Sequence, residues 1–340
     1  MYQRTRFLFI VVLCVALSLV VPARMQVQAA PDATTYLVNP AVTTNLAAYW
    51  PLDPSAVGMN QDASGNGNHG SKVGGVSISS AAPTLFANPR GRMFDGTDDH
   101  IWAPDSASLD LTDAMTLAMW VYLDNTNQQY LLSKRPAAVN AGYALSIDHA
   151  AQIRGEIWDS SGTLFTVTGG SVNTGAWFHV ALTFQRNGNM VVYKQGTAMN
   201  TAAASSNAIG VNNGNLVIGA ASWSTNSFEV DGRIDDVRVY NRALSAGEVA
   251  NLAAGKCPQA GTTWVTAFDN IQCALAASTS GDEIWVKQGT YKASLDGDAS
   301  ISYTLKDGVS LYGGFNGTEA LRSQRNPSAN LTTLSGDLNG

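Results

Sequence analysis

One segment, Gly232–Val249, constrains the fold of this chain more than any other, because it predicts a strand that runs directly into a short helix. Val237 and Val239 alternate with Arg238, which is the two-residue period of a strand with one buried face. Extended backwards, the same period predicts that Asp235 shares the face of the two valines. A carboxylate on an apolar face is costly unless a cation or several hydrogen-bond donors compensate it. The segment therefore predicts a strand with a compensated acidic site at its start.

The helix that follows has a recognisable beginning and end. Ser245 and Glu248 have the spacing of a capping box, and the helix should stop near Gly255. Before the strand, the chain holds many short apolar runs at regular spacing, separated by Gly- and Asn-rich turns. Only 14% of the residues are charged, which suits an extracellular β protein. We therefore expect an all-β fold, an antiparallel sandwich, for this part of the chain.

Several motifs occur in a characteristic order along this sandwich. They are Tyr49-Trp50-Pro51-Leu52-Asp53, Asp62–Gly70, Phe94-Asp95-Gly96, Thr116–Val121, Trp177–Thr183 and the closing strand described above. Together these motifs resemble the laminin-G-like jellyroll family, a branch of the concanavalin A-like lectin and glucanase sandwiches. The resemblance covers residues 45–254 and implies an antiparallel jellyroll β-sandwich.

The first 29 residues have the features of a secretory signal peptide. Arg4 and Arg6 form a basic start, Leu8–Val21 is apolar, and a small-residue cleavage site ends at Ala29. An uncleaved membrane anchor is the alternative, but an apolar run of about 14 residues is short for a bilayer span. We therefore expect a secreted or cell-surface protein with no membrane insertion after cleavage, in which residues 30–44 form a linker to the jellyroll.

Two cysteines would remain after removal of the signal peptide, which contains Cys14. They are Cys257 and Cys273, and in an exported protein we predict a disulfide between them. In the chain-entropy description, closing so short a loop contributes on the order of 3 kcal/mol. Two buried thiols are the alternative.

The sequence pattern changes after the jellyroll. Residues 255–263 read as a second linker, and Thr266–Ala277 predicts a helix with Phe268, Ile271 and Leu275 on one stripe. Three strand-and-turn units follow; they contain Ile284 and Val286, then Ile301, Tyr303, Leu305, Asp307, Gly308, Val309 and Leu311, then Leu331 and Leu334. The units recur at roughly 20 to 25 residues, which suits the rungs of a parallel β-helix.

This part has a family resemblance of its own. Gly281–Tyr291, Leu311–Glu319 and Leu334–Asp337 resemble the opening of bacterial surface right-handed β-helix domains, in which a short helix often caps the first rung. Residues 264–340 are therefore expected to form the cap and the first, incomplete rungs of a parallel β-helix. Because a solenoid needs a terminal cap, we expect the chain to be part of a longer surface protein.

The sequence offers little for catalysis. Retaining glycoside hydrolysis needs two carboxyl groups about 5 to 5.5 Å apart, and the related form is a Glu-x-Asp-x-x-Glu strand. Glu229-Val230-Asp231 comes closest, but position 234 is Ile. No Gly-x-Ser-x-Gly motif is present, and His179 lies between apolar strand residues. We therefore expect no reaction to be catalysed by residues 1–340.

A structural calcium site is the metal hypothesis that the sequence supports. Ca²⁺ takes six to eight oxygen ligands, many from loop aspartates and carbonyl groups. The resemblance implies that the Asp62 loop meets the start of the closing strand. The predicted ligands are Asp62, Asn66, His69, Asp95, Asp235 and Asp236. The alternative is that Asp62 forms an Asx-turn and Asp235 accepts backbone N–H groups, with no metal.

Four aromatic residues could form a platform for sugar: Trp102, Tyr130, Trp158 and Trp223. Such residues in β-sandwiches also serve as core or edge cover. The formal charge of −6 argues against nucleic acid as a partner. We therefore expect a secreted or cell-surface bacterial binding or adhesion protein that recognises glycan or extracellular protein. The alternatives are an accessory module of a polysaccharide-degrading enzyme, with its active site on later rungs, and a structural spacer.

Overall fold

The structure is a computed structural model, and it describes residues 35–38, 45–52, 60–79, 91–137, 139–224, 228–254, 262–264, 267–268, 271–292 and 302–335. The predicted signal peptide lies outside these residues. Within the part of the chain that is described, no helix has the length and apolar character needed to cross a membrane.

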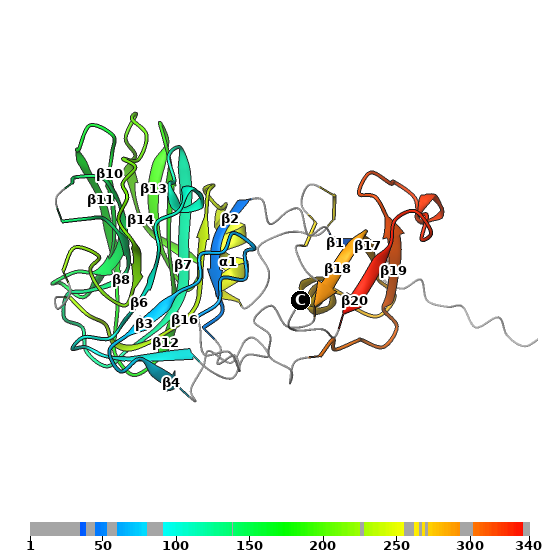
Figure 1. Ribbon diagram of the computed structural model, residues 1–340, viewed down its shortest axis with the longest axis horizontal. Coiled ribbons are helices and arrows are strands. Elements are labelled where there is room, and N and C mark those ends of the chain that lie inside the picture. The colour runs from blue at the N-terminus through cyan, green and yellow to red at the C-terminus, as the bar shows by residue number, and fades with distance from the viewer. Residues whose placement is uncertain are drawn as a thin grey trace, which may run out of the picture. The chain divides into compact units, whose positions relative to one another are not determined.

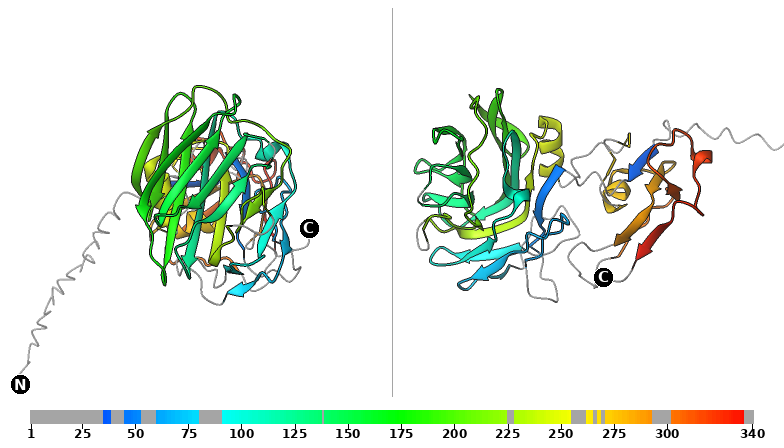
Figure 2. Two further views of the ribbon diagram at one scale, coloured as in Figure 1. Left: turned by 90° about the vertical axis from the view of Figure 1, so that its left-hand side faces the viewer. Right: turned by 45° about the horizontal axis from the view of Figure 1, so that its top comes forward.

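The jellyroll consists of two antiparallel sheets (Figure 1). The seven-stranded sheet has the order β11-β10-β9-β8-β15-β6-β3, with β3 (Ser71–Val73), β6 (His100–Ala103), β8 (Gln129–Lys134), β9 (Gly142–Ile147), β10 (Gln152–Trp158), β11 (Leu164–Ser171) and β15 (Leu216–Ile218). The left view of Figure 2 looks onto the green strands of this sheet.

The eight-stranded sheet has the order β14-β13-β12-β7-β16-β5-β4, and β2 also pairs with β16. Its strands are β2 (Leu46–Trp50), β4 (Ser77–Ser79), β5 (Gly91–Asp95), β7 (Ala114–Leu123), β12 (Trp177–Gln185), β13 (Asn189–Lys194), β14 (Thr197–Ala203) and β16 (Asp231–Tyr240). A short 3-10 helix, η2 (Ala107–Leu109), lies between β6 and β7 in the sequence. The expected antiparallel sandwich is confirmed.

The core lies between the two sheets and follows strand alternation. In β7, every second residue is fully buried in the core: Met115, Leu117, Met119, Val121 and Leu123. Because successive side chains of a strand point to opposite faces, the residues between these core residues lie on the outer face of the sheet. Residues that are directly paired across antiparallel strands share a face, so the outer-face residues of neighbouring strands lie side by side.

Helix α1 (Ala246–Ala253) covers part of the outer face of the eight-stranded sheet (Figure 1). Its start is the predicted capping box: the Ser245 side chain accepts from the Glu248 N–H, and Glu248 accepts from the Ser245 N–H. Val249 and Leu252 are buried in one cluster with Leu46. The first and last elements of the jellyroll are therefore packed together.

The predicted face of Asp235 is wrong, because β16 contains a β-bulge. Asp235 pairs with Trp120 on β7, whereas Arg238 pairs with Ala118, so the register shifts between them. Asp236 has φ of 52°, in the left-handed region, and its N–H donates to Asp235 Oδ1 at 2.9 Å. The extra residue places Asp235 on the outer face, while Val237 stays in the core. The acidic pair thus belongs to the bulge.

The part after the jellyroll contains short parallel sheets. Its elements are α2 (Ile271–Ala277), β17 (Glu283–Lys287), β18 (Gly289–Lys292), β19 (Ser310–Phe315), η3 (Arg322–Gln324) and β20 (Thr332–Ser335). One sheet has the order β1-β17-β19 and includes β1 (Thr35–Val38); the other pairs β18 with β20. The expected linker at 30–44 therefore contains a strand of this part. The described residues of this part form two short parallel sheets and not a complete β-helix.

Other expectations for this part have mixed outcomes. Phe268, Ile271 and Leu275 are buried in one cluster, but the helix is shorter than predicted: α2 begins at Ile271, and Ala267 and Phe268 before it are not helical. Residues 302–306 do not form the expected strand, although the turn at Gly308, with φ of 76°, does form. Cys257 lies outside the described residues, so its disulfide to the buried Cys273 stays a prediction.

A buried polar cluster lies on the outer face of the eight-stranded sheet. His179 is buried against Trp120, with ring centroids 5.5 Å apart, and its Nδ1 has no hydrogen-bond partner among the described residues. Asp236 and Arg238 form a buried ion pair at 3.0 Å. Burial lowers the pKa of His179 to about 4, and the positive charge of Arg238 contributes, while Asp236 opposes the shift. The imidazole is therefore neutral at neutral pH.

We expect this histidine to make the protein sensitive to mild acid. An unfolded histidine takes up a proton near pH 6.5, whereas buried His179 resists protonation until about pH 4. The free energy of unfolding should therefore decrease as the pH is lowered from about 6.5 to about 4, by on the order of 3 kcal/mol for this group. The measurement is thermal unfolding against pH. His179→Gln should flatten the profile, and the exposed His149→Gln should leave it unchanged; equal profiles for all three proteins would contradict the assignment.

Candidate functional site

The outer face of the seven-stranded sheet gathers the polar and aromatic side chains that strand alternation keeps out of the core. Trp102 pairs with Val217, and Val217 pairs with Ser133 on β8. Ser133 in turn pairs with Ala144, and Ala144 pairs with Glu156 on β10. These five residues therefore form one row across the outer face of the sheet.

A pocket of about 470 Å³ opens at the Trp102 end of this row. Its apolar lining consists of Val73, Trp102, Val217, Ala220 and Ala221. Its polar lining consists of Asp98, His100, Asn215, Ser222 and Ser224. A half-buried indole among amide, hydroxyl and imidazole groups is the mixture expected of a small-molecule site.

An aromatic cluster adjoins the pocket and contains the other three predicted aromatic residues. Tyr130 contacts Trp223 edge to face, with ring centroids 4.6 Å apart. The Arg135 guanidinium lies 4.2 Å from the ring centre of Trp158 and 4.5 Å from that of Trp223. Ser222 and Ser224, on either side of Trp223, line the pocket. The pocket and the cluster therefore share one turn of the chain.

The four predicted aromatic residues are close together but differ in exposure. Tyr130 and Trp158 are buried, at 4% and 6% exposure, and they support their neighbours as edge cover. Trp102 and Trp223 are half-buried and keep surface for a ligand. Arg135 joins the site without any sequence signal.

The buried Tyr130 hydroxyl belongs to a satisfied polar group. It donates to Glu156 Oε2 at 3.1 Å, and Arg154 Nε lies 2.7 Å from Glu156 Oε1. Burial and the charge of Glu156 hold the pKa of Tyr130 well above its usual range. The phenol therefore stays protonated and donates its hydrogen bond to the Glu156 carboxylate. The same carboxylate holds Arg154 in place through their ion pair.

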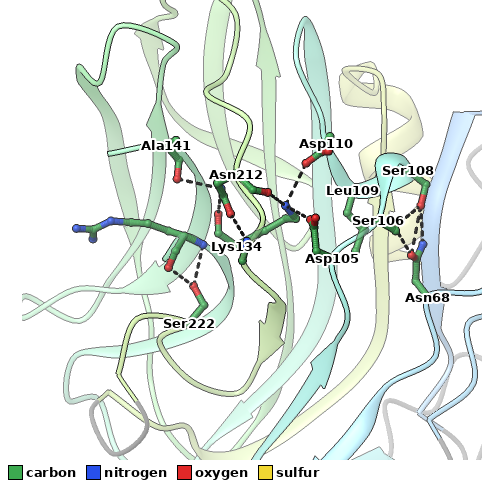
Figure 3. Close-up of polar contacts among 12 residues, drawn as sticks. Asn68, Asp105, Ser106, Ser108, Leu109, Asp110, Lys134, Ala141, Asn212 and Ser222 are labelled. Atoms are coloured by element: carbon green, nitrogen blue, oxygen red, sulfur yellow. Dashed lines mark hydrogen bonds and ion pairs between the residues drawn. The ribbon is translucent and has the colours of Figure 1, made fainter. Parts of the chain in front are cut away.

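A buried charge network lies at the end of β8, the middle strand of this sheet (Figure 3). Lys134 Nζ lies 2.8 Å from Asp105, 3.1 Å from Asp110 and 2.7 Å from the Asn212 carbonyl. The amide of Asn212 donates to the carbonyl of Ala141 at 3.1 Å. Lys134 therefore ties the segment around η2 to the end of β8, next to Arg135.

The Asp62 loop closes on itself through hydrogen bonds. Asp62 Oδ1 accepts from the N–H groups of Tyr49 and Ser64, both at 2.9 Å. Asp62 Oδ2 accepts from Ser64 Oγ at 2.8 Å and from the Asn68 N–H at 2.9 Å. A carboxylate has about four acceptor positions, so the chain's own donors occupy all of them. Asp62 therefore does not fit a calcium ligand.

The side chains of the other predicted ligands also have partners in the chain, although the atoms expected to bind calcium in the Asn66–His69 loop were its carbonyl oxygens. Asn66 Nδ2 donates to the carbonyls of Leu46 and Ala47, and His69 Nδ1 accepts from the Asp62 N–H at 3.2 Å. Asp235 and Asp236 belong to the bulge described above. These contacts match the Asx-turn alternative.

One group of three acidic side chains among the described residues could hold a metal ion: Asp95, Asp98 and Asp99, whose oxygen atoms lie within 4.8 Å of one another. Asp99 is buried and accepts from the N–H groups of Gly75 and Asp95. Burial raises the pKa of Asp99, and the charge of Asp95 adds to the increase. Asp95 is the member of the predicted calcium set that lies here.

Calcium stays a prediction, and one experiment separates the two acidic groups. Asp62→Asn should lower stability by about 1–3 kcal/mol, because backbone donors lose their acceptor. The loss should be the same in Ca²⁺ and in EDTA, measured by thermal unfolding. Asp95→Asn is the comparison, since a cation held there would give a loss in Ca²⁺ only. A loss confined to Ca²⁺ for Asp62→Asn would restore Asp62 as a ligand.

A laminin G family model, described as the concanavalin A-like lectin/glucanases superfamily, matches residues 95–250, which is less than half of the chain. The match agrees with the antiparallel jellyroll described above and with the resemblance that the motifs suggested. No curated protein matches the chain.

Solved structures share this fold at low sequence identity. The binding domain of Paraclostridial Mosquitocidal Protein 1 has 16% identity and a TM-score of 0.50, over 62% of this chain and 52% of that chain. The receptor binding domain of botulinum neurotoxin D has 15% identity and a TM-score of 0.50, over 63% and 53%. Domain 4 of AbnA, an arabinanase from Geobacillus stearothermophilus, has 19% identity and a TM-score of 0.48, over 62% and 98%. This chain spans about half the length of the two toxin structures.

Proposed function

We propose that the jellyroll is a glycan-binding module and that it binds through the outer face of its seven-stranded sheet. The observation that carries the proposal is the pocket of about 470 Å³ around Trp102. An indole offers a flat apolar surface to the C–H face of a sugar ring. Asn215, Ser222 and Ser224 supply the hydroxyl and amide groups that hydrogen-bond sugar hydroxyls.

The fold suits a binding role. The two toxin domains that share it were solved as a binding domain and as a receptor binding domain. Both sheets of this jellyroll are buried against each other on their inner faces, so a ligand has access only to outer surfaces and loops. Among the described outer surfaces, the one around Trp102 combines a pocket with a half-buried indole.

The role that we propose for the whole chain is the one expected from its sequence. We propose a secreted or cell-surface bacterial binding or adhesion protein, with a glycan or an extracellular protein as ligand and no catalysis by residues 1–340. The two parallel sheets are proposed as the first rungs of a right-handed β-helix, because β1, β17 and β19 pair in succession and β18 pairs with β20. An accessory module of a polysaccharide-degrading enzyme and a structural spacer are the alternatives.

A glycan array probed with the whole chain distinguishes a binder from a spacer. Trp102→Ala should weaken binding to the glycans found there at least about tenfold, since truncating an aromatic anchor costs on the order of 2 kcal/mol. Titration calorimetry measures the change. Tyr122→Ala is the matched control: it removes a half-buried aromatic ring from the outer face of the other sheet, where Arg233 lies 4.2 Å from the ring centre.

The two variants test the outer faces of the two sheets separately. Binding that is lost in Trp102→Ala and kept in Tyr122→Ala supports the pocket. The reverse result would move the site to the eight-stranded sheet. Absence of binding to every glycan on the array would favour the spacer.

A further inference from the structure

Arg135 is the distinctive cation of the proposed glycan site. Its guanidinium contacts two indole rings, 4.2 Å from the centre of Trp158 and 4.5 Å from the centre of Trp223. Contacts of this kind are favourable for a planar, delocalised cation. They hold the guanidinium beside the pocket, because Trp223 lies in the turn that lines it.

The backbone holds this arrangement in place. The Arg135 N–H donates to Ser222 Oγ at 2.8 Å, and Ser222 Oγ donates to the Arg135 carbonyl at 2.7 Å. The Ser222 N–H donates to Ser133 Oγ at 2.7 Å. The turn that carries Trp223 is therefore fastened directly to the end of β8. These hydrogen bonds keep the backbone of Arg135 next to the turn that carries Trp223.

The charge of Arg135 has no acidic partner among the described residues. Its neighbour Lys134 is neutralised by Asp105 and Asp110 in the buried network, as Figure 3 shows. Arg154, on the same face of the sheet, is neutralised by Glu156 at 2.7 Å. Arg135 takes part in no ion pair of the described chain, and its Nε is buried with no hydrogen-bond partner.

We infer that Arg135 binds the carboxylate of an acidic sugar, which deepens the proposed glycan-binding function and rests on it. A guanidinium presents parallel N–H donors at its edge, and a carboxylate accepts two such bonds side by side. The adjoining pocket, with Trp102 and the serines of the shared turn, holds the neutral part of the glycan. A uronic acid and a sialic acid both supply this chemistry, as a ring carrying hydroxyl groups and one carboxylate.

The test compares acidic glycans with their neutral counterparts on the whole chain. The probes are trigalacturonate against galactotriose, and sialyllactose against lactose, measured by titration calorimetry. The acidic member of at least one pair should bind about tenfold or more tightly, because charge-assisted bidentate hydrogen bonds are stronger than neutral ones. The pair that shows the preference identifies the source of the carboxylate.

Arg135→Met should remove this preference, so that the acidic and the neutral member of the pair bind with similar affinity. Arg135→Lys keeps the charge without the bidentate geometry and should keep only part of the preference. Arg233→Met is the matched control, since Arg233 also stacks on an aromatic ring, Tyr122 at 4.2 Å, on the other sheet. Circular dichroism and the melting temperature establish that each variant is folded.

The outcomes separate this inference from the proposed function. Binding of neutral and acidic probes with equal affinity, unchanged in Arg135→Met, overturns the carboxylate assignment and leaves glycan binding intact. Equal loss of both probes in a folded Arg135→Met protein also overturns it, because Arg135 would then serve only to hold the two indoles. Absence of binding to every probe by the unaltered chain overturns both.

Discussion

The jellyroll depends on one long strand, β16, which is paired along both edges with strands from much earlier in the chain. One edge pairs with β7; the other pairs first with β5, through Asp231–Ile234, and then with β2, from Val237 onward. The bulge at Asp235 and Asp236 lies where the partner changes. The N–H of Asp236 is satisfied by the carboxylate of Asp235, so the acidic pair supplies the acceptor that the interrupted ladder lacks. Such distant pairings are slow to form, and they fix the register of the whole sheet once formed.

This bulge also shows where prediction from the sequence reached its limit. The alternation of Val237 and Val239 against Arg238 was correct, because it depends only on the two-residue period of a strand. The face of Asp235 was wrong, because one extra residue reverses the alternation for everything before it. Nothing in the apolar pattern shows which residue adopts a left-handed conformation, although Asp is among those that tolerate it. The capping box of α1 was predictable because all its contacts lie within four residues.

The candidate site also has a part that could be predicted from the sequence and a part that could not. Its aromatic residues could be named from residue type, and the structure brings all four to one face of the seven-stranded sheet. Their partner Arg135 could not be named, because the residues that define its environment lie far along the chain, at Trp158 and Trp223. The sequence shows two adjacent cations, Lys134 and Arg135, with nothing to distinguish them. Only the fold shows that one is neutralised by buried carboxylates and the other is not.

The pairing of β1 with β17 bears on how the two parts of the chain can coexist. These strands are hydrogen-bonded neighbours, yet the whole jellyroll lies between them in the sequence. A domain inserted between paired strands adds little strain if its own ends are close together, since the connection it replaces then stays short. The jellyroll meets this condition: Leu46 on its first strand is buried in one cluster with Val249 and Leu252 on its last helix. The cluster that joins the first strand of the jellyroll to its last helix therefore keeps the two ends of the domain close together, which is compatible with pairing of the parallel strands across some two hundred residues.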